Sequence, residues 1–244
     1  VACAELGYHV LLEKPVAPTE DACRRIVAAV KKSNVLFAVC HVLRYTSQTR
    51  KIKELIAAGA IGDVVSIQRL ESVGYWHQAH SFVRGNWRNE AESSFMLLAK
   101  CCHDVDWICH VMEGKCERVS SFGALTHFTP ANRPAHAAAR CVDCPAEVER
   151  GCPYSALKIY LRDRLDQGQN LWPVNILTSD TSREGVLRAL NEGPYGRCVY
   201  ACDNDVVDHQ VVNFQFSGNR SASLTMTAFG ECGRRTTIFG TRGN

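Results

Sequence analysis

The sequence predicts a mixed fold in two parts, an α/β unit followed by a larger α+β domain. Val10 to Leu12 is a short apolar run that ends abruptly at Glu13-Lys14-Pro15, as a buried parallel strand does. A helical pattern and a second apolar run over 35–42 follow, which completes a β-α-β unit of a doubly wound sheet. From residue 64 onward, longer runs alternate apolar and polar residues, as antiparallel strands do. We therefore expect a mostly antiparallel open sheet with helices on one face in the second part.

Polar side chains follow both strands of the first part, at the point where each strand ends. Pro15 cannot donate to a sheet and biases Lys14 away from a helix, so the first strand stops there. Thr19 is expected to cap a helix that runs to about Ser33. The second strand is followed by His41, Arg44 and Tyr45. Because ligands collect outside the carboxyl ends of such strands, these groups are expected to face a cleft. For the Glu-Lys-Pro tripeptide alone, a solvated strand end is the commoner explanation.

Residues 75–88 combine two tryptophans, two histidines and two arginines in fourteen positions. Such a mixture is typical of a loop that holds a polar ligand, because an indole covers an apolar face while imidazole and guanidinium groups bind oxygens. A loop whose tryptophans pack into the core is an equally open explanation. The substrate-binding candidates in this segment are Trp76, His80, Trp87 and Arg88.

A helix is expected over 94–112, with an apolar stripe of residues at three- and four-residue spacing. Lys100, His103 and Trp107 fall on nearly the opposite side of this helix. A helix packed on a sheet normally shows Glu and Lys to water there, whereas a histidine between a lysine and a tryptophan favours a face that lines a pocket. Histidine is also the side chain whose protonation changes most easily near neutral pH.

Composition excludes several classes of protein. The 244 residues are 46% apolar and 22% charged, which is typical of globular chains. The net charge of +3 comes from dispersed lysines and arginines without basic blocks, which argues against nucleic-acid binding. No apolar run is long enough to cross a membrane, and no leader segment is recognisable. The 13 cysteines are odd in number and lie in apolar segments, which favours reduced thiols and a cytoplasmic location.

A long irregular insert is expected over 127–152, and it contains Cys141-x2-Cys144 and then Cys152. The first pair has the spacing of a zinc knuckle, but tetrahedral zinc needs a fourth ligand. The candidates for that ligand are His127, His136, Cys198 and Cys202. Because no spacing fixes the fourth ligand, the pattern favours free thiols or a redox-sensitive cluster over zinc. After the insert we expect helices over 154–165 and 182–191, and then strands over 205–216, 220–229 and 234–240.

Glu13-Lys14-Pro15 and the segment Leu97 to Asp106, LLAKCCHDVD, together resemble the Gfo/Idh/MocA family. Its members move hydride between NAD or NADP and sugars, cyclitols or related alcohols. The resemblance implies that residues 1–44 are the C-terminal remnant of a Rossmann domain and that 45–244 form a domain for substrate binding and dimerisation.

The resemblance also assigns roles to residues. It implies that Lys14 lies near the nicotinamide and the reacting hydroxyl, with Glu13, Pro15 and His41 also at the cofactor. His103 would be the acid/base. Lys100 is a candidate to assist His103, because Ala99 stands where the family commonly has an aspartate. Substrate contacts would come from the four aromatic-segment candidates above and from Arg44, Tyr45, Asp106 and Trp107.

The family's glycine-rich phosphate loop, G-x-G-x-x-G, does not occur in these residues. The resemblance places that loop before Val1, so we expect this chain alone to be inactive and to bind NAD or NADP weakly or not at all. The resemblance further implies a homodimer formed through the C-terminal sheet. A different hypothesis, which the residues leave open, is a non-catalytic binding or dimerisation module with a zinc-binding cysteine insert.

Overall fold

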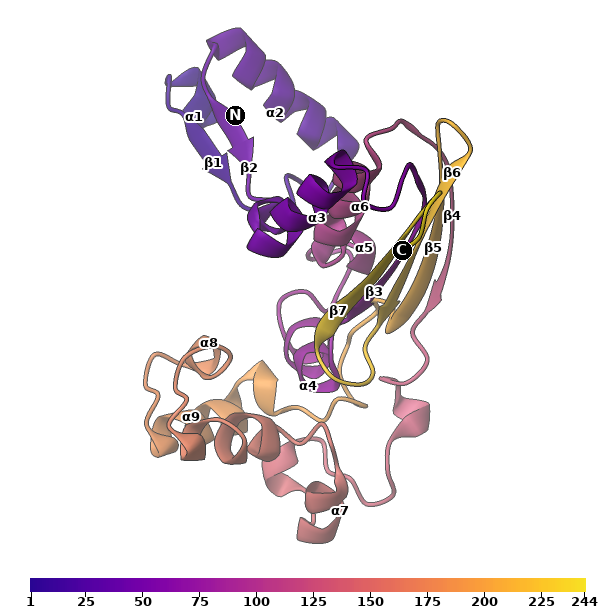
Figure 1. Ribbon diagram of the computed structural model, residues 1–244. Helices are drawn as coiled ribbons and strands as arrows, with labels where there is room; N and C mark the ends of the chain where they lie inside the picture. The colour runs from indigo at the N-terminus through magenta and orange to yellow at the C-terminus, as the bar shows by residue number, and fades with distance from the viewer.

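The computed structural model describes residues 1–244 and has three parts (Figure 1). The first part is a β-α-β unit made of β1 (Val10–Leu12), α2 (Glu20–Ser33) and β2 (Phe37–Val39), preceded by the short helix α1 (Ala2–Glu5). The two strands pair in parallel, with Leu11 opposite Ala38. Thr19 caps α2 by accepting a hydrogen bond from the backbone N–H of Ala22 at 3.2 Å, as the sequence predicts.

The second part is a five-stranded sheet with helices on one face. Its strands lie in the order β4-β5-β6-β3-β7. Their bounds are β3 Val64–Ser72, β4 Cys116–Ala124, β5 His209–Phe216, β6 Arg220–Thr227 and β7 Gly233–Gly240. The helices are α3 (Ser47–Ala57), α5 (Met96–Ala99) and α6 (Cys102–Met112). All neighbouring strands are antiparallel except β3 and β6, so the expected mostly antiparallel open sheet is confirmed.

The third part is a helical lobe between β4 and β5, at the bottom of Figure 1. It contains α7 (Ala146–Gly151), α8 (Val174–Leu177), α9 (Arg183–Glu192) and a π-helical turn over Leu157–Arg162. It packs against α4 (Tyr75–His77) and a second π-helical stretch, Gln78–Arg84, which follow β3. No helix in the structure is both long enough and apolar enough to cross a lipid bilayer.

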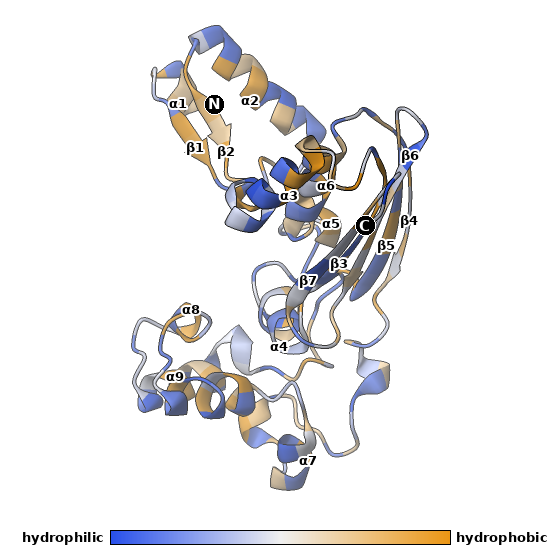
Figure 2. Ribbon diagram, viewed as in Figure 1, coloured by the Kyte–Doolittle hydropathy of each residue, from blue (hydrophilic) through white to orange (hydrophobic).

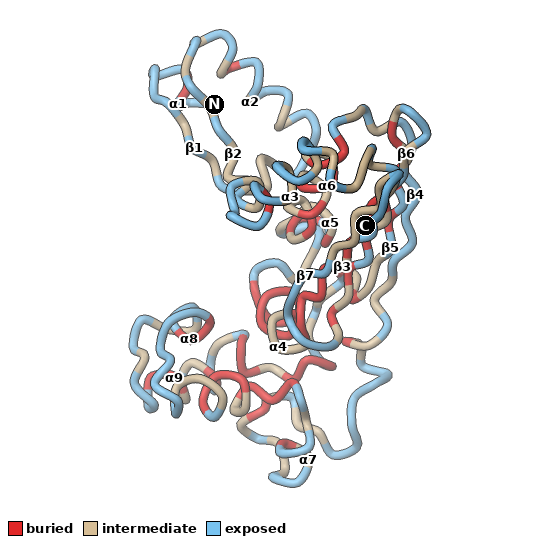
Figure 3. Tube along the Cα trace, in the orientation of Figure 1, coloured by how far each residue is buried: buried red, intermediate tan, exposed pale blue.

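The second part and the third part each have a hydrophobic core. The first core joins the inner face of the sheet to α6, through residues such as Ile108, Phe214 and Leu224. The second core lies within the helical lobe, around Tyr160 and Leu190. Figure 3 shows the buried residues concentrated in these two regions, whereas the β-α-β unit contains few of them. The arrangement puts the end of β1 and the start of α6 next to each other.

The expected burial of the first strand is wrong. Although β1 and β2 are apolar (Figure 2), Leu11 is 74% exposed and Leu36 is 72% exposed. The physical reason is that these two strands form a two-stranded sheet of their own, which leaves both of these side chains uncovered.

The expected single helix over 94–112 is also wrong. The chain forms α5 and α6 with a break at Lys100 and Cys101, where the backbone leaves helical geometry. Lys100 and His103 therefore do not lie on one continuous helix, as a helical wheel assumes. A wheel cannot detect such a break because both segments consist of residues with adequate helix propensity.

Candidate functional site

Lys14 from the first part reaches the break between α5 and α6 in the second. The strand β1 ends two residues before it, and the Lys14–Pro15 peptide bond is cis. The Lys14 Nζ donates a hydrogen bond to the backbone oxygen of Ala99 at 3.1 Å. This contact places an ammonium group beside the segment that carries His103. The two motifs that the sequence singles out therefore meet across the boundary between the two parts.

His103 lies in the first turn of α6, partly buried, and its Nδ1 atom is buried without a hydrogen-bond partner. Burial, and then the positive charges of Lys14 and Arg234, lower the pKa of His103 to about 4. The imidazole is therefore neutral at pH 7 and able to accept a proton. The ring of His41, which follows β2, lies edge-on to it with the ring centroids 6.0 Å apart.

A second link between the parts is an ion pair one turn further along α6. Asp106 accepts from Arg44, with the Nε atom 2.7 Å from Oδ2. The second guanidinium nitrogen bonds the other carboxylate oxygen, so the pair is bidentate. His41 Nδ1 lies 3.8 Å from Asp106 Oδ2. Arg44 and Asp106 thus fix the first part against α6, next to His103.

Lys100 is held by a buried ion network on the inner face of the sheet. Its Nζ lies 3.3 Å from Oε1 of Glu71, which is 1% exposed. Arg234 of β7, directly opposite Glu71 in the ladder, lies 2.8 Å from both Glu71 and Asp104. Asp104 also accepts from Arg69 Nε at 2.6 Å. Three cations and two carboxylates therefore form one buried network, which adjoins His103 through the neighbouring residue Asp104.

An aromatic cluster lies at the start of the helical lobe. Trp76 stacks on His77, and both rings contact Trp172, with centroids 5.3 Å and 5.1 Å away. Burial, followed by the charges of Lys100, His80 and Lys14, lowers the pKa of His77 to about 3. His77 therefore belongs to the same electrostatic neighbourhood as Lys14 and Lys100.

His80 is placed deeper than a substrate contact would need. It is 2% exposed, stacks on Tyr195 and bonds the Tyr160 hydroxyl at 2.9 Å. Burial, and then the charge of Arg84, lower its pKa to about 4. This environment resembles the interior of a core more than the wall of a binding site.

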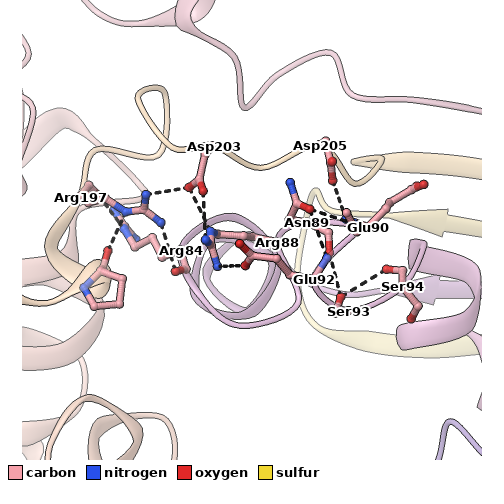
Figure 4. A network of polar contacts seen from close by, with 12 residues as sticks. Arg84, Arg88, Asn89, Glu90, Glu92, Ser93, Ser94, Arg197, Asp203 and Asp205 are labelled. Atoms are coloured by element: carbon pink, nitrogen blue, oxygen red, sulfur yellow. Dashed lines mark hydrogen bonds and ion pairs between the residues drawn. The ribbon is translucent and has the colours of Figure 1, made fainter. Parts of the chain in front are cut away.

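The other predicted substrate residues are spread over the molecule. Arg88 binds Asp203 through two hydrogen bonds of 2.9 Å and 3.0 Å, in a surface network that includes Arg197 (Figure 4). Trp87 is 39% exposed and Tyr45 is 72% exposed. Trp107 is buried under Arg69, whose guanidinium carbon is 4.3 Å from the ring centroid, and it donates to Thr49 Oγ1 at 2.9 Å.

The predicted metal site at Cys141, Cys144 and Cys152 is not supported. No group of three or more His, Cys, Asp or Glu side chains in the structure is placed to hold a metal ion. All 13 cysteines are free thiols, as the odd count and apolar surroundings predict. Cys141 lies in a 3-10 turn, Cys141–Asp143, and Cys144 is the extended residue that follows this turn.

Sequence reasoning missed Glu71, Asp104 and Arg234 as members of the site, and it left His77 unassigned. A signal was present for Glu71. The inward positions of an alternating strand should be apolar, yet β3 has Arg69 and Glu71 there. Charged residues in an inward register indicate a buried ionic network, but the pattern alone does not identify its partners.

The low histidine pKa values predict that acid destabilises the fold. In the unfolded chain these groups titrate near 6.5, whereas His77, His80 and His103 titrate at about 3 to 4 in the fold. Between these pH values the unfolded chain binds more protons than the folded chain. The contribution of the three histidines to the free energy of unfolding is therefore complete above pH 6.5 and declines as the pH falls toward 4.

For His80 alone the loss is up to about 3 kcal/mol, from the size of its shift and the free energy of one pKa unit. We expect His80→Gln to flatten the pH dependence of the free energy of unfolding, measured by urea titration between pH 7 and pH 4.5. An unchanged slope in the variant would show that His80 charges as easily in the fold as in the unfolded chain.

Part of this chain matches a known protein family. A family profile described as the GFO/IDH/MocA C-terminal domain matches residues 49–150. This match bears out the resemblance to the Gfo/Idh/MocA family that the two sequence motifs indicate. The matched range includes His103, Asp104 and Asp106, whereas Lys14 lies outside it.

Several relatives of this chain are named as oxidoreductases or dehydrogenases. An uncharacterized oxidoreductase of Streptococcus pneumoniae is 31% identical over 123 residues, which are 50% of this chain and 32% of that protein. The scyllo-inositol 2-dehydrogenase (NADP(+)) IolW of Bacillus subtilis is 29% identical over 112 residues, 46% of this chain and 30% of that protein.

Solved structures of dehydrogenases share the fold over nearly the whole chain. A probable dehydrogenase from Thermotoga maritima has a TM-score of 0.59 at 16% identity, covering 99% of this chain and 50% of that one. The scyllo-inositol dehydrogenase of Lactobacillus casei, solved with NAD(H) and scyllo-inositol, has a TM-score of 0.57 at 18% identity, covering 97% and 49%. The chain thus spans about half the length of these structures.

Proposed function

We propose that this chain is the substrate-side portion of an NAD(P)-dependent oxidoreductase that transfers hydride between the nicotinamide and a hydroxyl-bearing carbon of a sugar or cyclitol. The observation that carries the proposal is the meeting of Lys14 and His103 across the boundary between the two parts. A lysine and a neutral histidine at one site match the needs of alcohol oxidation. The first can bind the hydroxyl oxygen, and the second can take its proton.

In the direction of oxidation, the substrate hydroxyl would lie between Lys14 and His103. The Lys14 ammonium stabilises the negative charge that develops on the oxygen. His103 accepts the hydroxyl proton, because its depressed pKa keeps the imidazole neutral. A bound nicotinamide would supply the acceptor for hydride. In the direction of reduction, the same imidazole returns the proton to the oxygen.

The residues present fit one end of such a cofactor. Glu13, Lys14, Pro15 and His41 follow the carboxyl ends of the parallel strands β1 and β2, where nucleotides bind in open α/β sheets. No glycine-rich phosphate loop occurs within these residues. The uncovered Leu11 and Leu36 suit a larger parallel sheet, which supports a division into a partial nucleotide-binding domain, residues 1–44, and a substrate domain, residues 45–244.

For the substrate we propose a polyhydroxylated ring. The stacked Trp76 and His77 offer an apolar surface and a hydrogen-bonding nitrogen close to Lys100 and Lys14. Relatives named as acting on scyllo-inositol agree with this class. Arg44 and Asp106 bind each other, so we assign them to positioning α6 and not to direct substrate contact.

The test is turnover by the full-length gene product with NAD or NADP and a panel of cyclitols and sugars, including scyllo-inositol. We expect NAD(P)H formation with at least one of them. We expect the 244-residue chain alone to bind NADH weakly or not at all in calorimetry, since it lacks a phosphate loop. Submicromolar binding by the chain alone would contradict the second expectation. Failure of every polyol with a folded full-length protein would contradict the first.

We also propose a homodimer formed through the outer face of the sheet. On this face Phe122 of β4, 77% exposed, lies opposite Val211 of β5, which is 39% exposed. Two adjacent exposed apolar side chains on this sheet face suit a second copy of the same surface. We expect light scattering to give the mass of a dimer and Phe122→Lys to shift it toward the monomer. A monomer mass for the unsubstituted protein would rule out this interface.

A further inference from the structure

Four of the free thiols line one cavity in the helical lobe. Cys141 and Cys198 are buried there, whereas Cys144 and Cys152 are partly exposed, so the cavity communicates with solvent. Its volume is about 20 Å³, which is room for a molecule about the size of water. The proposed oxidoreductase chemistry uses none of these residues. The thiols therefore need an explanation of their own.

Arg84 forms one wall of this cavity and is a buried cation without a carboxylate partner. It is 1% exposed, and its hydrogen bonds go to the backbone oxygens of Arg197 and Tyr154 and to the sulfur of Cys141 at 3.4 Å. Its Nη1 atom is buried with no partner at all. An unpaired buried charge is costly, so a group that can become negative is expected next to it. The sulfur of Cys141 is the side-chain atom in that position.

Among the four cavity thiols, only Cys141 accepts a hydrogen bond from Arg84. Burial raises the pKa of Cys152 and of Cys198, so both remain protonated at neutral pH. Cys198 lies on a segment that pairs with that of Cys141, through the bridge between Arg140 and Arg197 and the bond from Cys198 N to Ala139 O at 2.8 Å. The cavity thus combines one thiol that is hydrogen-bonded to a guanidinium group, Cys141, with protonated thiols that line the same cavity. This is the arrangement of an attacking and a resolving cysteine.

We propose that Cys141 is an oxidation-sensitive thiol that reacts with hydroperoxides and then forms a disulfide with another thiol of the same cavity. The Cys141 thiolate, paired with Arg84, attacks one oxygen of hydrogen peroxide, breaks the O–O bond and becomes a sulfenic acid while hydroxide leaves. A second cavity thiol then attacks the sulfenyl sulfur and releases water. Two thiols lose two electrons in total, and one peroxide is reduced to two molecules of water.

The test is oxidation by hydrogen peroxide in slight excess, followed by alkylation and peptide mapping. Trypsin cleaves after Arg140, Arg150 and Arg197, so Cys141, Cys152 and Cys198 fall in different peptides. We expect Cys141 to be lost on the order of 10-fold faster than the exposed Cys3 and Cys232, because a thiolate reacts where a free thiol does not. We expect its product to be a disulfide to Cys144, Cys152 or Cys198.

Two variants complete the test. Cys141→Ser should leave the other cavity thiols reduced under the same conditions. Arg84→Met should slow the loss of Cys141 to the rate of Cys3 or below, with folding checked by circular dichroism; should it not fold, the comparison of cysteines in the unsubstituted protein decides alone. Oxidation of Cys3 and Cys232 with Cys141 still alkylatable would overturn the proposal. Stoichiometric zinc in protein purified without chelator, with these thiols shielded, would also overturn it.

Discussion

Replacing His103 with glutamine is expected to lower kcat/KM of the full-length protein by about 10²- to 10⁴-fold, the usual contribution of a general acid or base. Glutamine is close in size and can still form hydrogen bonds, but it cannot take up the hydroxyl proton. The loss should appear mainly in kcat, because the proton moves in the transition state. Steady-state kinetics with the best substrate of the polyol panel measures it.

His110 offers a matched control on the same helix. It lies two turns further along α6, is partly buried, and its backbone oxygen, not its ring, accepts from Lys53. His110→Gln should leave kcat/KM within a few-fold of the unsubstituted protein. Equal kinetics for the two variants, with both folded, would remove His103 from the acid/base role that we propose.

Replacing Asp104 with asparagine is expected to lower the free energy of unfolding by about 3–5 kcal/mol, the cost of removing one partner from a buried ionic network. Asp104 is fully buried and accepts hydrogen bonds from Arg69 and Arg234. Without its charge, two guanidinium groups remain near each other with only Glu71 to balance them. Urea unfolding at pH 7, followed by circular dichroism, gives the change.

Asp203 provides the comparison for this prediction. It also binds two arginines, Arg88 and Arg197 (Figure 4). Its side chain, however, is 54% exposed. Water and salt screen such pairs, so Asp203→Asn should cost about 1 kcal/mol or less. Similar losses for the two variants would show that the network behind His103 is not desolvated in solution.

Local signals in the sequence account for much of the fold. The helix α2 begins after Thr19 and contains acidic residues in its first turn and lysines in its last, all of which are readable from the chain. The hairpin between β5 and β6 is equally local, because Gly218 and Asn219 accept the positive φ values that its turn requires. Such elements depend on neighbouring residues only.

Long-range pairing could not be predicted in the same way. Nothing in β6 indicates that its partner on one side is β3, in parallel, or that β7 crosses to the far edge of β3. The catalytic candidates follow the same division. Lys14 and His103 stand out because each motif is compact, whereas Arg234 is recognised only when β7 lies beside β3.

The position of α6 has a mechanical consequence. Three contacts join the first part of the chain to this region: Lys14 to Ala99, Arg44 to Asp106, and His41 edge-on to His103. Two of them lie in the N-terminal half of α6, and the third lies at Ala99, the last residue of α5. A hinge motion between the two parts would have to break these contacts before it could separate the ammonium from the imidazole. Under the proposed function, Lys14 and His103 would therefore stay side by side while substrate and product exchange.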